Sequence, residues 1–369
     1  MKKYLLFCIT LFLVACQLET TDDRIENVKI LKNIAKSINV NDVFGDFKFV
    51  NIDVNDSCLM RNPRKVILEK DILFISDGNS IFQYSIDGRY IRSLNRKGRG
   101  PQEYFDVLDF VVYGDNVFII DRNMKILKFS TDNKYLASSK LDFFPATIYP
   151  LNNKELLLTS AYQNEVDKFH VFDSNSLREL SSFCPINKAE LTYRHIMDQA
   201  NFYEFDKKLR FHEPMNNYIY DIDDNKVSAV YHFDFYGMNP PSDFWTQSYS
   251  NVMDINMKAT REKYCFGIPV YAENNDNIIF TYRDAEKYLM CLYSKKKGDA
   301  IQFESIEFFK KMPPILIEDL SCNFFSNENL TIAIPGHLFF DENDQIYVQE
   351  LASVIKNNGN PVICLVKLK

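Results

Sequence analysis

The sequence predicts an all-β protein, a six-bladed β-propeller that carries an N-terminal tether and a helical insertion near residues 240–265. Three observations lead to this prediction: a strand-turn-strand pattern that recurs at a nearly constant interval, turn dipeptides at equivalent places, and many aromatic residues. A period of roughly 40 to 50 residues that holds four strands is typical of propeller blades. A β-sandwich with regular hairpins is the alternative, but sandwiches do not usually repeat one signature at a fixed interval.

The composition supports strands. The 369 residues include 31 Phe and 21 Tyr against one Trp and 11 Gly, which favours β-structure. Charged residues at 25% and hydrophobic residues at 46% are ordinary for a globular protein and exclude wholesale disorder. The net charge of -7 supplies no basic face, so we expect no nucleic-acid partner.

The two clearest copies of the repeat lie early in the chain. Asp71–Asp77 matches Asp115–Asp121 with an offset of 44 residues. The next strand repeats as well, as Ile81–Tyr90 and Leu127–Tyr135. Each unit therefore has an apolar strand, a short turn, an alternating strand and a second turn before a third strand.

Turn dipeptides and aromatic anchors follow the same period. Asp87-Gly88 and Asp132-Asn133 tolerate positive φ, as tight antiparallel hairpins require. The aromatic anchors, separated by 45, 43 and 48 residues, are Tyr84, Phe129, Phe172 and Tyr220.

Weaker copies continue to the end of the chain and bring the count to six blades, with five or seven as lesser alternatives. We expect the strand 48–53 to complete the last blade and close the ring. The weaker copies are 155–159 with 169–173, 209–211 with 218–222, 277–282 with 288–293, and 345–349 with 362–366.

The first sixteen residues have the pattern of a signal peptide that ends in a cysteine. Lys2 and Lys3 precede the apolar stretch Tyr4–Val14, which is too short to span a bilayer of roughly 30 Å as a permanent helix. The stretch ends in Leu13-Val14-Ala15-Cys16, which resembles the lipobox of bacterial lipoproteins. The resemblance implies a signal peptide over 1–15, lipid attachment at Cys16 and a membrane partner reached through that lipid. An ordinary cleaved secretory signal is the alternative.

Residues 16–28 are expected to form the lipidated tether, followed by a single propeller domain over 29–369. The segment Gln17–Asp23 is polar and lacks the Asp directly after Cys16 that resembles an inner-membrane retention signal in enterobacterial lipoproteins. We therefore expect an outer membrane lipoprotein. Its acidic residues resemble the export signals of surface lipoproteins in Bacteroidetes, and a solvated linker explains them equally well. Both the periplasmic and the surface-exposed face stay open.

One segment breaks the period after Tyr236. Pro240 and Pro241 followed by Ser242 predict a helix start with Ser242 as its N-cap. We expect an inserted arm whose helix lies on one face of the propeller, where it either shapes a ligand surface or only packs.

The cysteines and histidines show no metal-binding pattern, so no metal ligand is assigned, and a metal held in the channel by histidines of several blades stays open. The mature cysteines lack a CxxC motif, and most are expected to be buried as small apolar side chains. An exported compartment permits one or two disulfides. The mature cysteines after Cys16 are Cys58, Cys184, Cys265, Cys291, Cys322 and Cys364, and the histidines are His170, His195, His212, His232 and His337.

A loop after the first clear repeat resembles a known family. The segment Arg96-Lys-Gly-Arg-Gly-Pro-Gln-Glu-Tyr104 resembles the GxGPGE[FY] segment of the six-bladed β-propeller lipoproteins common in Bacteroidetes, which are similar to NHL-repeat propellers. Gln102 departs from the pattern, since the family usually has Gly there. The resemblance covers about residues 25 to 369 and implies a fold. It implies no activity, because the family is mostly without assigned biochemistry.

Four residues are candidates for ligand binding. Arg96 and Arg99 concentrate positive charge beside glycine amides, where a carboxylate or a sulfated sugar would bind; a structural crossover between blades is the alternative. Asp77 and Asp121 end equivalent strands. On an innermost strand they would reach a ligand in the central channel, and as turn caps they would accept backbone N–H bonds instead.

The function expected from these features is binding. No GxSxG, P-loop or GxGxxG motif occurs in the required context, so no catalytic residue is assigned, and the sequence contains no cofactor motif and leaves any cofactor unknown. The leading hypothesis is a binding or interaction protein for a glycan, a peptide or a partner protein. The alternatives are an NHL-like propeller enzyme, a lyase or hydrolase with a metal in the central channel, and a scaffold of outer-membrane transport machinery.

Overall fold

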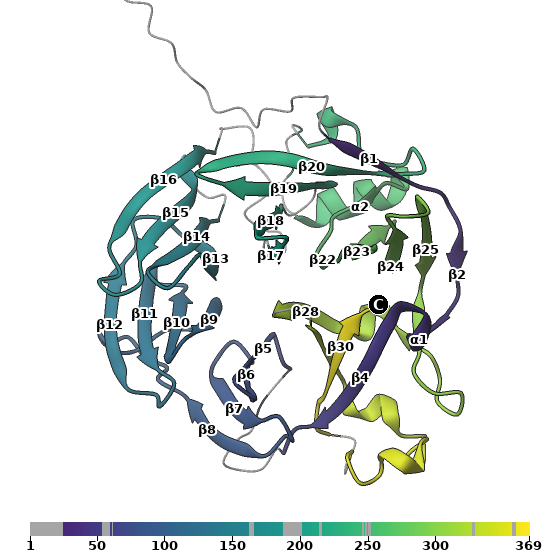
Figure 1. The fold of residues 1–369 in the computed structure, drawn as a ribbon, viewed down its shortest axis with the longest axis horizontal. Coiled ribbons are helices and arrows are strands. Elements are labelled where there is room, and N and C mark those ends of the chain that lie inside the picture. The colour runs from purple at the N-terminus through teal and green to yellow at the C-terminus, as the bar shows by residue number, and fades with distance from the viewer. Residues whose placement is uncertain are drawn as a thin grey trace, which may run out of the picture.

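Figure 1 shows the computed structural model, a ring of β-sheets around a central axis. The predicted signal peptide, Cys16, Cys58 and His195 lie outside the described residues. These residues are 25–53, 60, 62–161, 166–186, 201–213, 216–245, 247, 249, 252–285, 287–326, 329–355 and 359–369.

Within these ranges the strands form seven sheets, which we number as blades in chain order from β5. Blade 1 contains β5 (Lys65–Glu69), β6 (Ile72–Ser76), β7 (Ile81–Ser85) and β8 (Tyr90–Leu94). Blade 2 contains β9 (Asp109–Tyr113), β10 (Asn116–Asp121), β11 (Lys125–Ser130) and β12 (Tyr135–Lys140). Blade 3 contains β13 (Pro145–Pro150), β14 (Glu155–Ser160), β15 (Asp167–Asp173) and β16 (Glu179–Pro185).

The later blades also use strands from the N-terminal segment. Blade 4 contains β17 (Asn201–Phe205), β18 (Lys208–His212), β19 (Tyr218–Asp223), β20 (Lys226–Phe235) and β1 (Glu26–Ile30). Blade 5 contains β21 (Cys265–Phe266), β22 (Tyr271–Glu273), β23 (Asn277–Asp284), β24 (Lys287–Ser294), β25 (Asp299–Phe303) and β2 (Ile34–Ala35). Blade 6 contains β26 (Ser305–Glu307), β27 (Ile315–Leu316) and β3 (Ile38–Asn39). Blade 7 contains β28 (Ser321–Ser326), β29 (Asn329–Ile334), β30 (Val362–Leu368) and β4 (Phe44–Asn51).

The prediction of six blades is therefore wrong: counting each described sheet as a blade gives seven. Six of these sheets have four or more strands, whereas blade 6 has three strands of only two or three residues each. Strands this short hold no readable alternation of polar and apolar residues, so the repeat pattern misses them.

The ring closes as expected from the sequence. Strand β4 pairs antiparallel with β30, with Phe49 opposite Cys364 and Val50 opposite Ile363, so the two ends of the chain share blade 7. The N-terminal segment reaches β4 along the outside of the ring (Figure 1). On the way β1 pairs in parallel with β20 and β2 with β25. Since β1 begins at Glu26, the sheet already includes the last residues of the segment 16–28 expected as a tether.

A repeated β-bulge explains the aromatic anchors. In blades 1 to 4 the register between the third and fourth strands shifts at Tyr84, Phe129, Phe172 and Tyr220. Each anchor ring is buried, and one residue of the outer strand opposite it is left unpaired by the shift. Bulges bend an outer strand and discourage edge-to-edge pairing with another sheet. The skipped residues are Ile91, Leu136, Leu180 and Val230.

The prediction of a strand at 345–349 is wrong. The strand that precedes β30 in blade 7 and pairs with it is β29, Asn329–Ile334. Between β29 and β30 the described residues form the isolated bridge between Phe340 and Ile346 and the short helices η5 (Gly336–Phe339) and η6 (Gln349–Leu351). Phe339, Val348 and Ile355 bury their side chains in the core without joining a sheet. The apolar residues of this segment are therefore spaced as in a strand, but they are apolar because they pack in the core.

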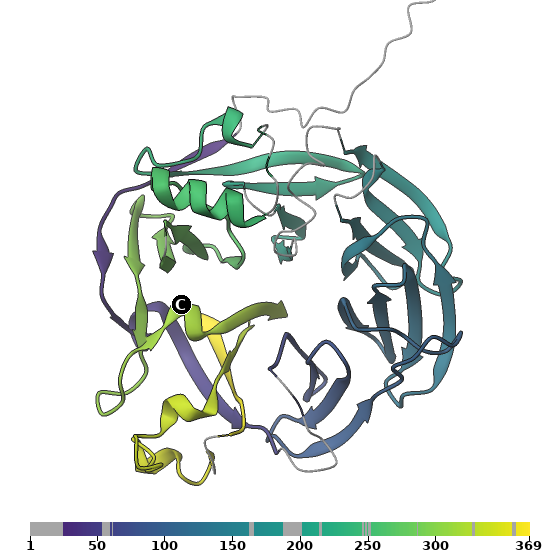
Figure 2. The same ribbon diagram turned by 180° about the vertical axis from the view of Figure 1, so that it is seen from behind.

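The helical insertion lies where the sequence predicts it, between β20 and β21. Helix α2 spans Val252–Glu262, and a short turn of helix, η3, spans Ser242–Phe244. Ser242 is not an N-cap: Pro241 holds that position, and no side chain caps η3. Figure 2, which views the molecule from behind, shows α2 in front of the strands of blades 4 and 5. The other short helices of the described part of the chain are α1 (Val40–Val43) and η4 (Ile317–Asp319).

Replacing Gly88 by Ala is expected to lower the free energy of unfolding by about 3 kcal/mol. Gly88 has φ +86°, and a Cβ there would lie 1.9 Å from the carbonyl oxygen of Asn51 in the closing strand β4. Left-handed strain and overpacking each cost on the order of 1 to 3 kcal/mol. Gly298→Ala is the matched control, because φ is +68° there but nothing lies within 4 Å of the added atom. Urea unfolding of both variants measures the difference, and equal losses would contradict the close approach of β4.

Candidate functional site

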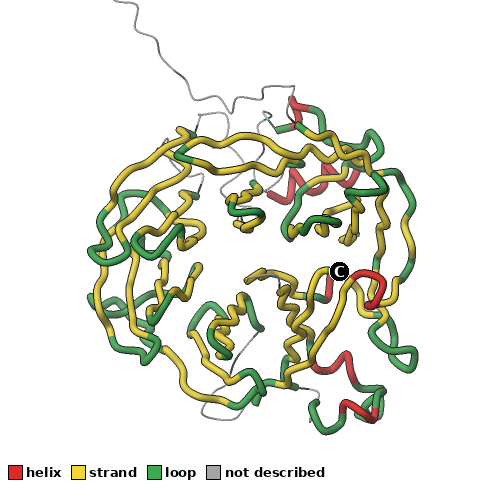
Figure 3. The backbone as a smooth tube through the Cα atoms, in the orientation of Figure 1, coloured by secondary structure: helices red, strands yellow, loops and turns green. Residues whose placement is uncertain are grey.

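The innermost strands enclose a central channel of about 1120 Å³. The tube in Figure 3 shows these strands facing the axis of the ring. The channel is lined from β5, β9, β13, β17 and β22 and from the end of β30, and its wall includes residues of the turns that follow β9, β17 and β22. These turns lie at the opposite strand ends from the connection that carries α2, so the turn-lined mouth and α2 lie on opposite faces of the ring.

Aromatic side chains form one side of the channel. The ring centroids of Tyr149 in β13 and Phe202 in β17 lie 5.3 Å apart, and those of Tyr203 and Tyr271 lie 6.1 Å apart. The Tyr149 hydroxyl donates to Oε2 of Glu204, 3.4 Å away. Burial, with the Glu204 charge adding to it, raises the pKa of Tyr149, so this hydroxyl stays protonated. The wall thus combines ring faces with a hydrogen-bonding carboxylate.

Polar side chains crowd the turn-lined mouth. Glu204, Asp206, Lys207, Asn275 and Lys367 all line the channel and are exposed. Charges of both signs are present with an amide among them. A ligand that both donates and accepts hydrogen bonds would find partners here.

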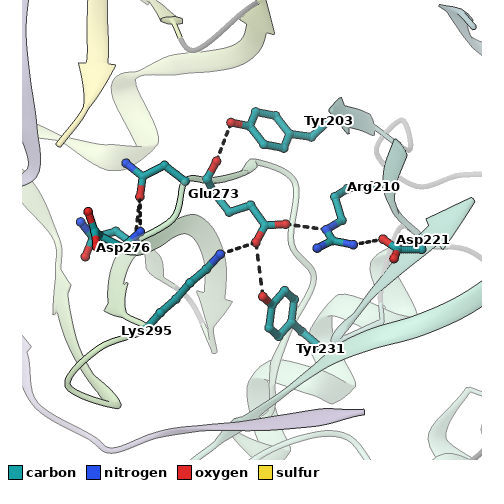
Figure 4. A network of polar contacts seen from close by, with 9 residues as sticks. Tyr203, Arg210, Asp221, Tyr231, Glu273, Asp276 and Lys295 are labelled. Carbon is teal, nitrogen blue, oxygen red and sulfur yellow. Dashed lines mark hydrogen bonds and ion pairs between the residues drawn. The ribbon is translucent and has the colours of Figure 1, made fainter. Parts of the chain in front are cut away.

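A largely buried charge network, drawn in Figure 4, includes the channel residues Tyr203 and Glu273. The Glu273 carboxylate accepts from Arg210 Nε at 2.5 Å, from Lys295 Nζ at 2.6 Å and from the Tyr231 hydroxyl at 3.3 Å. Arg210 also pairs with Asp221. The Tyr203 hydroxyl donates to the carbonyl oxygen of Glu273 over 2.7 Å, which fixes the ring of Tyr203 at the channel.

The network joins the innermost strands of blades 4 and 5. Glu273 ends β22, whereas Arg210 lies in β18, which pairs with β17. Burial raises the pKa of Tyr231 above its usual range and the nearby Glu273 charge adds to the effect, so this phenol remains a donor. The Lys295 ammonium lies 4.3 Å from the ring centroid of Phe205, a further channel residue.

A second polar link joins blades 1, 2 and 3. Asp109, buried at the start of β9, accepts from Lys65 Nζ of β5 at 2.7 Å. Its other carboxylate oxygen accepts from the Thr147 hydroxyl of β13 at 2.6 Å and from the Ile148 amide at 3.0 Å. Charge-assisted bonds of this kind hold three channel strands in register.

The predicted residues Asp77 and Asp121 are buried turn caps. The Asp77 carboxylate accepts from the amides of Asn79 and Ser80 at 2.8 and 2.9 Å. The Asp121 carboxylate accepts from the amides of Asn123 and Phe105. Both residues lie at the end of the second strand of a blade rather than the innermost one, so neither lines the channel described above.

The predicted residues Arg96 and Arg99 lie in the crossover from blade 1 to blade 2 and are exposed. Within this loop Glu103 Oε2 accepts from the Gly100 amide at 2.8 Å, and a Cβ at Gly98 would meet the same oxygen at 2.0 Å. The Tyr104 hydroxyl donates to the Leu94 carbonyl at 2.8 Å. The glycines and the Glu of the motif therefore shape the turn, and neither arginine belongs to the channel lining described above.

The described histidines are dispersed. His170 stacks on Phe143 with ring centroids 3.6 Å apart and bonds Glu179, while His232 bonds Asn27. His212 is buried in β18, and His337 lies in η5. Among the described residues no group of three or more His, Cys, Asp or Glu is placed to hold a metal ion. Cys184, Cys265, Cys291 and Cys364 are buried, as expected for small apolar side chains.

Sequence reasoning missed the channel residues. Tyr149, Phe202, Tyr203 and Glu273 lie on innermost strands, whereas the repeats found in the sequence are the second and third strands of each blade. The innermost strands vary because they share no common packing partner. A search for the strand that precedes each repeated pair would have identified them.

One comparison with a solved structure supports this fold. A structure described as a "putative exported protein" from Bacteroides fragilis is similar over 93% of this chain and 100% of its own, with a TM-score of 0.71 and 17% identity. The WD40 repeats of RRP9 are similar over 87% of this chain and 97% of their own, with a TM-score of 0.48 and 12% identity. A search of the curated proteins finds no match.

Two further findings concern the chain as a whole. None of the described helices is long and apolar enough to cross a membrane. The model of a domain of unknown function, DUF4934, matches residues 25–367, almost the whole of the propeller. The chain therefore belongs to the DUF4934 family.

Proposed function

We propose that this chain is an exported, lipid-anchored binding protein that takes a carbohydrate in its central channel. The observation that carries the proposal is the channel wall, where aromatic rings stand beside exposed carboxylate, amide and ammonium groups in a space of about 1120 Å³. Ligand sites are concave, are lined by aromatic side chains and hold a few convergent polar groups. Ring faces pack on the C–H faces of a pyranose, and the polar groups bond its hydroxyls.

The anchor is part of the same proposal. The lipobox-like segment ending at Cys16 supports attachment to the outer membrane, and the similar Bacteroides fragilis structure is described as exported. A peptide or a partner protein in place of the carbohydrate is an outcome that the following test distinguishes.

Calorimetric titration of the chain beginning after Cys16 with a panel of oligosaccharides tests the proposal. We expect Phe202→Ala to raise the Kd of the bound saccharide about tenfold, since an aromatic contact contributes on the order of 1.4 kcal/mol. Glu204→Ala is expected to act in the same direction without disturbing the fold, because Glu204 is exposed. Tyr288→Ala is the matched control, an exposed ring outside the channel lining.

Two results would count against the carbohydrate. If neither Phe202→Ala nor Glu204→Ala changes the Kd of the saccharide, the ligand binds outside the channel. A titration in which oligosaccharides give no heat while peptides bind, with loss in Phe202→Ala, would assign the channel to a peptide.

A further inference from the structure

The insertion between blades 4 and 5 presents an apolar helix face. Helix α2 buries Ile255 and Ala259 against Phe244 and Phe266. Met253 and Met257, one helical turn apart, lie on the other side and are 68% and 61% exposed. Flexible thioether side chains adapt to irregular apolar surroundings, which suits a surface that contacts an apolar partner.

The start of the propeller lies at the same corner of the molecule. Arg283 Nη1 donates to Asn256 of α2 at 2.9 Å, and the neighbouring Asp284 is 3.8 Å from Lys32 Nζ. Lys32 directly follows Leu31, which is 75% exposed. An exposed apolar residue of the N-terminal segment therefore lies beside the helix that carries the two methionines.

Basic residues occur in the same two segments as these apolar side chains. Lys29, Lys32, Arg261 and Lys263 are all exposed. Two of them have acidic partners at the surface, since Lys32 lies 3.8 Å from Asp284 and Arg261 pairs with Glu262. Apolar side chains flanked by Lys and Arg match the interface of an anionic bilayer.

We propose that this corner of the molecule lies against an anionic lipid bilayer. We call it the Met surface and define it as Leu31, Met253 and Met257 with Lys29, Lys32, Arg261 and Lys263. The inference rests on the proposed anchor at Cys16. Cys16 precedes Glu26, the first residue of β1, by ten positions. Ten residues span at most about 35 Å when fully extended, so the bilayer has to lie near the start of β1.

The proposal also orients the channel. Helix α2 lies in a connection from an outermost to an innermost strand, while the turn-lined channel mouth is formed at the opposite strand ends. With the Met surface on lipid, this mouth points away from the bilayer and toward the ligand's compartment.

The only Trp of the chain provides a native reporter. Trp245 lies in the insertion, and its ring centroid is 5.9 Å from that of Phe266, which packs against α2. The full-length lipidated protein is reconstituted into phosphatidylglycerol vesicles in which part of the lipid carries brominated acyl chains. Bromine quenches indole fluorescence only at short range, so we expect quenching of Trp245. The double variant Met253→Asp, Met257→Asp is expected to lose at least half of it.

The control is Met124→Asp with Leu180→Asp, two exposed apolar residues of blades 2 and 3, which should leave the quenching unchanged. Arg261→Glu keeps the methionines and reverses one positive charge. It is expected to weaken quenching most at low salt, because salt screens the attraction between this charge and the anionic lipid. Vesicle flotation of the same samples, with Cys16→Ser as the unlipidated form, reports the anchor separately.

The outcomes separate the two proposals. Flotation without quenching would retain the anchor and overturn the Met surface. If the full-length protein does not float, the anchor fails, and co-sedimentation of the unlipidated chain with phosphatidylglycerol vesicles decides the Met surface. Binding lost in the double variant would then support it, and no binding would overturn it.

Discussion

Glu273→Gln is expected to lower the free energy of unfolding by about 3 to 5 kcal/mol, the cost of removing one partner from a buried charge pair. Glu273 is fully buried and pairs with both Arg210 and Lys295. The amide keeps the size and the hydrogen-bonding reach of the carboxylate but removes its charge. The buried Arg210 would then keep the carboxylate of Asp221 as an anionic partner, whereas the partly exposed Lys295 would lose the charge of Glu273.

The matched control is Glu304→Gln. Glu304 pairs with Lys287 at 2.7 Å at the surface, and both side chains are partly exposed to solvent. Surface pairs contribute about 0 to 1 kcal/mol, so this variant should unfold close to the wild type in urea. Equal midpoints for the two variants would show that the inter-blade network does not stabilise the fold.

Acid is expected to destabilise the protein through His212. Burial lowers the pKa of this imidazole in the folded chain to about 3, from an ordinary value of 6.5. Below pH 6.5 the unfolded chain binds a proton at this residue and the folded chain does not, so stability is complete above pH 6.5 and falls as the pH drops toward 3. The loss by pH 4.5 amounts to about 2.7 kcal/mol.

His212→Leu isolates this contribution. Among the described residues the buried Nε2 atom of His212 has no hydrogen-bond partner, so an apolar side chain of similar volume is expected to be tolerated at pH 7. Urea unfolding of both proteins between pH 7 and 4.5 measures the difference. The variant's stability should fall less steeply by about 1.4 kcal/mol per pH unit below 6.5, and parallel curves would contradict the assignment.

Local patterns predicted most of the fold. The aromatic anchors Tyr84 and Phe129 repeat because each occupies the same position beside a bulge in a four-stranded sheet, and a repeated environment selects a repeated residue. The closing strand and the helical insertion were predicted for the same reason, since each depends on a pattern within a few residues. Two of the corrections, blade 6 and the segment 345–349, concern stretches whose structure depends on distant packing.

The candidate site could not be predicted in this way. Arg210 and Glu273 are 63 positions apart, and Lys65 and Asp109 are 44 apart, yet each pair meets at a buried contact. Neither pair has a sequence signature, because a charge pair between two blades requires only that the folded ring brings the two side chains together.

The sequence by itself determined the propeller class, the closure of the ring by an N-terminal strand and the position of the insertion, because periodic burial and turn chemistry act between near neighbours. Only the tertiary structure decided the number of sheets, the channel wall and its charge network. Those features arise where strands from different blades converge on one axis. Charges that are far apart in the chain pair there, and each buried charge depends on its partner because an unpaired buried charge is costly.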